Sequence, residues 1–143
     1  MTSPYVLDVS GYQPQARYYN FWATWKLRGV HGAIVKLSES TYYRNPYGAG
    51  QISAAQHEGM KVSGYHFSRF RGNASQAIAE ANYAIATANT MGLPQGSVLV
   101  LDYEERLGYR GSNTQAAIAF LNTVKSAGFT PVFYSYSGMA TLW

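Results

Sequence analysis

Two acidic residues, Asp102 and Glu104, come directly after the apolar residues 98–101. A short apolar run bounded by turn residues is typical of a buried strand. Because side chains alternate along a strand, both carboxyl groups leave it on the same face, with Cα atoms about 6.6 Å apart. Burying carboxyl groups is costly, yet a catalyst that uses one protonated and one ionised carboxyl needs such a pair. An isolated pair is also consistent with a helix cap or with pairing to Arg106.

The elements that must position these acids alternate between strand and helix. Strands are expected at residues 5–10, 32–37, 61–67, 98–101 and 130–135. Helices are expected at residues 18–28, 45–58, 74–91 and 112–127, each closed by a glycine, with a last helix from Ser137. The expected N-terminal caps are Asn45 with Pro46, Asn73, and Ser112 or Asn113. This alternation, with a unit of roughly 30 residues, predicts βαβ crossovers and a parallel sheet.

Every expected strand ends in polar or ionisable side chains, taken at alternate positions. These are Asp8, Lys36, His66, Asp102 with Glu104, and Tyr134. The carboxyl ends of parallel strands lie together in a sheet or barrel, and ligands bind there. The pattern therefore predicts a functional site at one rim, with Lys36 paired to a rim carboxylate. The second strand is followed by Tyr42, Tyr43 and Tyr47. Their position is consistent both with stacking on sugars and with packing of the loop.

The composition indicates one globular domain rich in aromatic residues. The 143 residues are 47% hydrophobic and only 13% charged, which excludes a disordered chain. The 13 tyrosines suit surfaces that stack on flat, hydroxylated ligands such as sugars, and they also fill cores. The net charge is +4, but the basic residues are spread along the chain and the nearest thing to a cluster is Arg69 with Arg71. We therefore expect no nucleic-acid partner.

The cysteine count and the hydropathy of the chain bear on where the protein acts. There are no cysteines, so disulfides and thiolate metal sites are excluded. The first residues have neither a basic nor an apolar signal region, and no apolar run approaches the roughly 20 residues of a membrane span. We therefore expect no signal peptide and no membrane insertion. If the protein acts outside the cell, we expect release from the cytoplasm or another route of secretion.

Five motifs in order along the chain resemble those of the family-25 glycoside hydrolases, the lysozymes of fungi, bacteria and their phages. They are residues 8–13 (DVSGYQ), 35–41 with 45–46 (VKLSEST and NP), 64–67 (GYHF), 102–104 (DYE) and 131–135 (PVFYS). Each motif is short, but together they cover almost the whole chain. The resemblance implies a TIM-like (β/α) barrel of parallel strands, of which about five βα units are present here.

The resemblance also implies a reaction and the residues that carry it. The reaction is hydrolysis of the β-1,4 bond between N-acetylmuramic acid and N-acetylglucosamine in bacterial peptidoglycan. Glu104 would be the general acid, and Asp102 and Asp8 would stabilise positive charge or position a water or the acetamido group of the substrate. The implied substrate-binding residues are Tyr134, Tyr65, His66, Glu39, Lys36 and Phe67. No cofactor or metal is expected, and the partner is the glycan strand of the cell wall.

The sequence departs from the family pattern at two points. Ser40 stands where the family usually has glycine, and the chain ends after five strands, whereas the family continues with more strands, another aspartate and a tryptophan-rich part. We therefore expect residues 1–143 to form a single catalytic-type (β/α) domain that lacks the C-terminal part of the barrel. Such a sheet has an open parallel edge, through which self-association could occur.

Two other classes of function are weighed against the enzyme. An inactive or weakly active fragment would hold glycan chains at its aromatic rim without cleaving them. A doubly wound domain of flavodoxin-like topology would be unrelated to sugars, but the expected phosphate-binding glycine loop is absent. His66 with Asp102 and Glu104 has ligand types that suit zinc or iron, but no second histidine stands at a metal-binding spacing.

Overall fold

Five parallel strands form one sheet whose strand order follows the order of the chain. The computed structural model describes residues 5–105 and 110–135. In this part of the chain the parallel strands are β1 (Tyr5–Val9), β2 (Val30–Glu39), β4 (Lys61–Phe67), β5 (Val98–Asp102) and β6 (Thr130–Tyr134), in the spatial order β1-β2-β4-β5-β6. A short strand, β3 (Tyr43–Arg44), pairs antiparallel with β2. The predicted parallel α/β architecture is confirmed.

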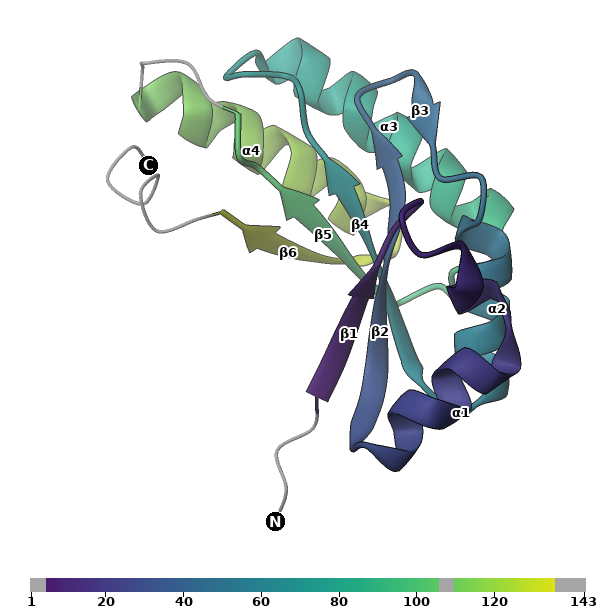
Figure 1. Ribbon diagram of the computed structural model, residues 1–143. Coiled ribbons are helices and arrows are strands. Elements are labelled where there is room, and N and C mark those ends of the chain that lie inside the picture. The colour runs from purple at the N-terminus through teal and green to yellow at the C-terminus, as the bar shows by residue number, and fades with distance from the viewer. Residues whose placement is uncertain (1–4, 106–109, 136–143) are drawn as a thin grey trace.

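The helices lie along one side of this sheet, as Figure 1 shows. They are the 3₁₀ helix η1 (Pro14–Arg17) and the α-helices α1 (Tyr19–Leu27), α2 (Gly48–His57), α3 (Ala74–Met91) and α4 (Arg110–Ser126). Right-handed crossovers that always step in the same direction place every helix on the same face of the sheet. A doubly wound domain requires the strand order to reverse, so the flavodoxin-like alternative is wrong. The arrangement is that of strands and helices in a (β/α) barrel, with one sheet face open.

The longest helix, α3, shows how the sequence builds the covered face. The Asn73 side chain accepts a hydrogen bond from the Gln76 backbone N–H at 3.0 Å, and Gly92 ends the helix with a φ of +82°. The alanines at positions 77, 81, 84 and 88 are fully buried and follow helical spacing, so this stripe faces the core. Small side chains let the helix lie close to its neighbours. The predicted bounds of this helix are confirmed.

Two other predicted helix starts are wrong. Helix α2 begins at Gly48, because the buried Asn45 side chain donates to the Lys36 carbonyl at 2.9 Å and accepts from the Tyr47 N–H at 3.0 Å, forming a turn before the helix. Helix α4 already includes residue 110, so neither Ser112 nor Asn113 caps it. The helix expected from Ser137 lies outside the described residues.

A β-bulge in β2 decides which of its side chains reach the open face. Lys36 and Ser38 pair with consecutive residues of β4, so Leu37 is the extra residue. Leu37 and Ser38 are both fully buried. On a regular strand residues 36 and 39 would point to opposite faces, but here the Lys36 ammonium lies 2.8 Å from a Glu39 carboxylate oxygen. The bulge therefore returns Glu39 to the same side as Lys36.

Candidate active site

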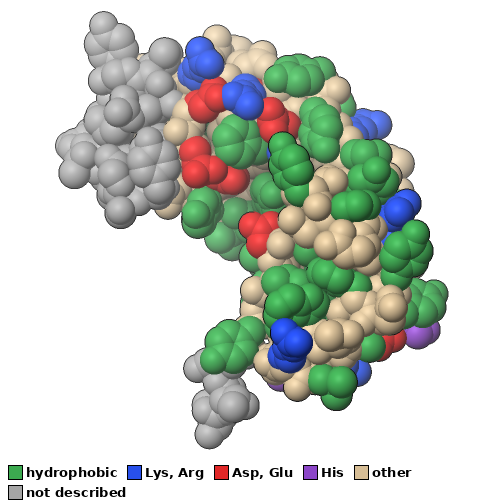
Figure 2. Space-filling view, in the orientation of Figure 1, with side chains coloured by type: hydrophobic (Ala, Val, Ile, Leu, Met, Phe, Trp, Pro, Cys, Tyr) green, Lys and Arg blue, Asp and Glu red, His purple; other side chains and the backbone are tan. Residues whose placement is uncertain are grey.

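A pocket of about 270 Å³ lies on the open face at the carboxyl ends of the strands. It is lined by Asp8, Ile34, Tyr65, Val100, Asp102, Glu104 and Tyr134. Asp102 pairs in register with Tyr134 of β6, and Val100 pairs with Tyr65 of β4, so these side chains share one face. Figure 2 shows acidic and apolar side chains gathered around the hollow on this side of the molecule. The structure thus brings the three predicted catalytic residues together with Tyr65 and Tyr134.

The crowding of carboxyl groups changes their proton affinity. Burial, reinforced by the neighbouring carboxyls of Glu104 and Asp8, raises the pKa of Asp102 to about 8, although Lys36 acts in the opposite direction. Its Oδ1 atom is buried without a hydrogen-bond partner. Partial burial also raises the pKa of Asp8, against the attraction of Lys36. One carboxyl of this pocket therefore carries a proton near neutral pH, as an acid catalyst requires.

Burial also changes the pKa of Tyr65, one of the two tyrosines that line this pocket. It raises the pKa of Tyr65, and the charges of Asp8 and Asp102 add to the effect. Tyr65 therefore keeps its proton throughout the physiological range and can donate a hydrogen bond. A neutral hydroxyl beside carboxylates suits recognition of a sugar hydroxyl or acetamido group.

The segment that carries Glu104 is anchored on both sides. Before it, the Tyr103 side chain is fully buried, packs edge-on against Phe70 at a centroid distance of 4.8 Å, and donates to Asn113 Oδ1 at 3.0 Å. After it, the Glu105 carboxylate pairs with Arg69 and Arg71. Strand alternation thus sends residue 103 into the core and leaves residue 104 at the pocket.

A second pocket of about 490 Å³ has Lys36 in its lining, and the charge of Lys36 also acts on Asp8 and Asp102 of the first pocket. Its lining residues are Ser10, Gly11, Tyr12, Lys36, Glu39, Tyr42, Tyr43, Pro46 and Tyr47. Tyr12 and Tyr42 are highly exposed, with relative accessibilities of 90% and 72%. The Lys36 ammonium lies 5.2 Å from the centre of the Tyr43 ring. The predicted pairing of Lys36 with a rim carboxylate is confirmed by its ion pair with Glu39.

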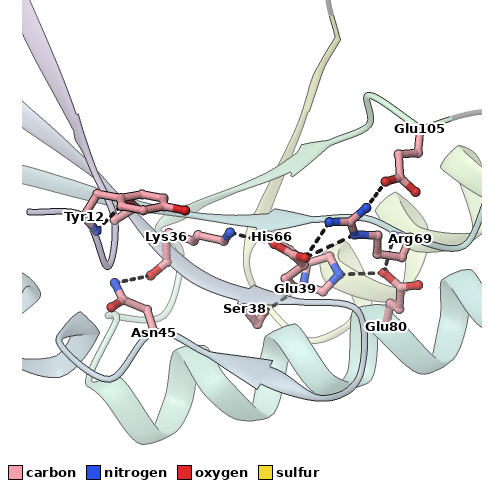
Figure 3. Close-up of polar contacts among 10 residues, drawn as sticks. Tyr12, Lys36, Ser38, Glu39, Asn45, His66, Arg69, Glu80 and Glu105 are labelled. Carbon is pink, nitrogen blue, oxygen red and sulfur yellow. Dashed lines mark hydrogen bonds and ion pairs between the residues drawn. The ribbon is translucent and has the colours of Figure 1, made fainter.

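The structure contradicts the placement of His66. This side chain is fully buried on the helix-covered side, where Nδ1 lies 2.7 Å from Ser38 Oγ and Nε2 lies 2.9 Å from Glu80 Oε1 of α3 (Figure 3). Burial lowers the pKa of His66, although Glu80 acts in the opposite direction. At the carboxyl end of β4 the residues that point to the open face are Tyr65 and Phe67. His66 is therefore not part of the rim, and a metal site with Asp102 is ruled out by its position.

Four of the other predicted substrate-binding residues divide between the two pockets, whereas Phe67 is in the lining of neither. Tyr65 and Tyr134 line the pocket with the carboxyl groups, and Lys36 and Glu39 line the second one. Phe67 is half-buried between the cations of Lys36 and Arg69, whose charged groups lie 5.5 and 5.0 Å from the centre of its ring.

The sequence does not indicate the contacts that Arg69 makes at the site. Its guanidinium donates to Glu39 through Nε and Nη2 at 3.1 and 2.8 Å, and it pairs with Glu105 through Nη1 (Figure 3). In the sequence, Arg69 is distinguished only by its closeness to Arg71. Nothing local in the sequence indicates these partners, because both are more than 29 positions away.

Within residues 5–105 and 110–135, no three acidic, histidine or cysteine side chains are grouped as the ligands of a metal ion would be. In the same part of the chain, no helix has the length and apolar character that a membrane span needs. The absence of a cofactor stays a prediction.

The comparisons with known proteins agree with this geometry. The family model described as glycosyl hydrolases family 25 matches residues 7–141. The lysozyme of Streptococcus phage Cp-9 is 35% identical over 131 residues, which are 91% of this chain and 35% of that protein. The lysozyme of Streptococcus phage Cp-7 is 39% identical over 109 residues, covering 76% of this chain and 30% of that protein. The chain thus spans about a third of the length of these curated relatives.

Solved structures share the fold. The modular Cpl-1 endolysin, complexed with a peptidoglycan analogue, is 31% identical with a TM-score of 0.75, and the match covers 95% of this chain and 37% of that one. A family 25 glycosyl hydrolase from Bacillus anthracis has a TM-score of 0.74 at 20% identity, over 95% of this chain and 62% of that one, a likeness of fold alone. The chain belongs to glycosyl hydrolase family 25, and the predicted family resemblance is confirmed.

Proposed function

We propose that this chain acts as a muramidase, a single catalytic-type (β/α) domain that hydrolyses the β-1,4 bond between N-acetylmuramic acid and N-acetylglucosamine in bacterial peptidoglycan. The observation that carries the proposal is the pocket in which Asp8, Asp102 and Glu104 converge beside Tyr65 and Tyr134. Family membership and the lysozymes among the relatives support it.

The proposed chemistry begins with a proton on the Asp102–Glu104 pair. The raised pKa of Asp102 keeps a proton on its carboxyl near neutral pH, within hydrogen-bond reach of the Glu104 carboxyl. Glu104 delivers this proton to the leaving glycosidic oxygen. Asp102, then ionised, and Asp8 stabilise the positive charge that develops at the anomeric carbon or position a water or the acetamido group. No cofactor takes part.

The proposed substrate groove extends from the pocket with the carboxyl groups into the second pocket. The exposed rings of Tyr12 and Tyr42 offer flat apolar surfaces for sugar faces, and the Lys36–Glu39 ion pair offers hydrogen-bond donors and acceptors for sugar hydroxyls. Two pockets at the carboxyl ends of neighbouring strands suit a polymer better than a single small sugar. The relative crystallised with a peptidoglycan analogue supports this choice of substrate.

The proposed reaction also implies where the protein acts. A peptidoglycan hydrolase acts on the cell wall, and the phage origin of the relatives supports release of this protein from the cytoplasm of an infected or lysogenic cell.

Release of reducing ends from purified peptidoglycan tests the proposal. The wild-type chain is expected to release fragments whose new reducing ends are muramic acid. The Glu104→Gln variant is expected to bind the same walls but to release no fragments. New ends at glucosamine, or binding by wild type with no release, would contradict the assignment. The second result would favour the glycan-binding alternative.

A further inference from the structure

Arg69 joins the rims of three strands at the level of the proposed catalytic pocket. Its guanidinium contacts Glu39 at the end of β2 through two nitrogens and Glu105 just after β5 through the third, while Arg69 itself follows β4. Figure 3 shows the guanidinium between these two carboxylates. Arginine suits this position because its planar group presents several donors in fixed directions.

The contacts of Arg69 extend to both sides. Glu39 uses its other oxygen to accept from Lys36 at 2.8 Å, and Glu105 uses its other oxygen to accept from the Arg71 Nε at 3.1 Å. The attraction of Lys36 and Arg69 outweighs burial and lowers the pKa of Glu39, so this carboxylate stays ionised. Five alternating charges therefore run from β2 across β4 to the segment after β5.

The backbone of Arg69 is fixed separately from its side chain. Its N–H donates to Oε1 of the fully buried Glu80 at 3.0 Å, and the preceding Ser68 N–H donates to the Asp102 carbonyl at 3.0 Å. Arg71 adopts a positive φ of +47°, which non-glycine residues seldom adopt. The guanidinium thus projects from a loop that is held to both α3 and β5.

We propose that Arg69 is a positioning residue for Glu104. Before Glu104, the Tyr103 side chain is fixed in the core, and after it the Glu105 carboxylate is held at the surface by its ion pairs with Arg69 and Arg71. Arg69 is the partner that also reaches β2, so it sets the distance between the β5 segment and the second pocket. The inference rests on the proposed function for the catalytic role of Glu104, whereas the contacts of Arg69 do not depend on that role.

Steady-state kinetics on soluble peptidoglycan fragments test the proposal through Arg69→Met, which keeps the apolar stem and removes the charge. We expect kcat to fall about 10- to 100-fold with little change in KM, because a small displacement of a catalytic group costs this much. Arg69→Lys should recover part of the loss, since an ammonium can satisfy one carboxylate but not both. Arg28→Met, in an exposed arginine after α1, is the matched control and should leave kcat unchanged.

A double-mutant cycle separates positioning from general damage. If Arg69 acts through Glu105, the variant that combines Arg69→Met with Glu105→Gln loses no more kcat than the more damaging single change. Additive losses would overturn the proposal, and so would an Arg69→Met variant whose KM rises while kcat is preserved, because that pattern marks direct substrate contact.

Amide hydrogen exchange gives a readout that does not depend on activity. In Arg69→Met, the amides of residues 103–105 should exchange about fivefold faster, the effect that an ion pair of this exposure is worth, with no change in Arg28→Met. Unchanged exchange would overturn the positioning role even if the enzyme is active. A wild-type chain without muramidase activity would instead contradict the proposed function, and the exchange result would still decide whether Arg69 holds this segment.

Discussion

On the helix-covered face of the sheet, the buried carboxylate of Glu80 receives hydrogen bonds on both oxygens, whereas on the open face Asp102 keeps a buried oxygen without a partner. Glu80 accepts from the Arg69 backbone at 3.0 Å, contacts His66 Nε2 at 2.9 Å, and accepts from Gln76 at 3.4 Å. Asp102 has instead the neighbouring carboxyls of Glu104 and Asp8.

The difference shows how one sheet uses the same chemical group in two ways. A buried carboxylate that is surrounded by donors is structural, because its ionised form is satisfied and its removal leaves the donors unpaired. A carboxyl crowded by other carboxyls resists ionisation and is therefore available to hold and release a proton.

Glu104→Gln should separate chemistry from folding most sharply. Removing the proposed proton donor is expected to lower kcat about 10³-fold or more, while the melting temperature stays near that of wild type, because the side chain faces the pocket. Reducing-end release and a thermal melt measure the two quantities. Glu58→Gln, at the end of α2, is the control and should leave both unchanged; an active Glu104→Gln variant would remove Glu104 from its role.

Glu80→Ala should do the reverse and damage stability first. It leaves the His66 ring and the Arg69 N–H without their buried acceptor, so we expect a loss of about 3 kcal/mol in the free energy of unfolding. Urea denaturation measures this loss. Glu80→Gln keeps an acceptor oxygen and should cost distinctly less; equal stability of Glu80→Ala and wild type would mean that this network is not structural.

Asp102→Asn should stabilise the protein at alkaline pH. The pKa of this group is raised from 3.8 to about 8 on folding, so its contribution opposes folding increasingly as pH rises from about 4 to about 8. The variant is expected to exceed wild type on the order of 1 kcal/mol at pH 8.5, since partial exposure screens the effect, and to match it at pH 3.5. Denaturant titrations at the two pH values test this, and a stability gain that does not depend on pH would contradict it.

Glu39→Gln should have the smallest effect and the opposite sign. The pKa of Glu39 is lowered in the folded protein by Lys36 and Arg69, which outweigh burial, so its contribution to stability is present above about pH 4.5 and is lost as pH falls through the folded value. We expect a loss of about 0.5 kcal/mol at pH 7 that disappears at acidic pH and in high salt. A loss that persists in 1 M salt would indicate packing rather than charge.

The features of the site that could be predicted from the sequence share a physical basis. Alternation along single strands placed Asp8, Asp102 and Glu104 correctly, because each follows an apolar strand whose last residues have an unambiguous face. On β4 the same reasoning placed His66 at the rim, because a polar side chain was expected at the strand end, and Tyr65 entered only through the family resemblance. Buried donors and acceptors from Ser38 and Glu80 reverse that expectation.

Other features depend on contacts between distant segments and were outside the reach of local patterns. The bulge at Leu37 shifts the face of Glu39, and no residue type in the sequence predicts it. The contacts of Arg69 with Glu39 and Glu105 require the relative register of β2, β4 and β5, which only tertiary packing fixes.

Carboxyl-carbon NMR titration of the wild-type chain measures directly whether the open face holds a proton, with Asp102→Asn used to assign the signal. We expect the Asp102 carboxyl to titrate with a midpoint near pH 8, and we expect this midpoint to fall when Glu104→Gln removes the neighbouring carboxyl. An Asp102 carboxyl that titrates near its ordinary pKa of 3.8, whether or not Glu104 is present, would contradict the claim that the open face holds a proton for catalysis.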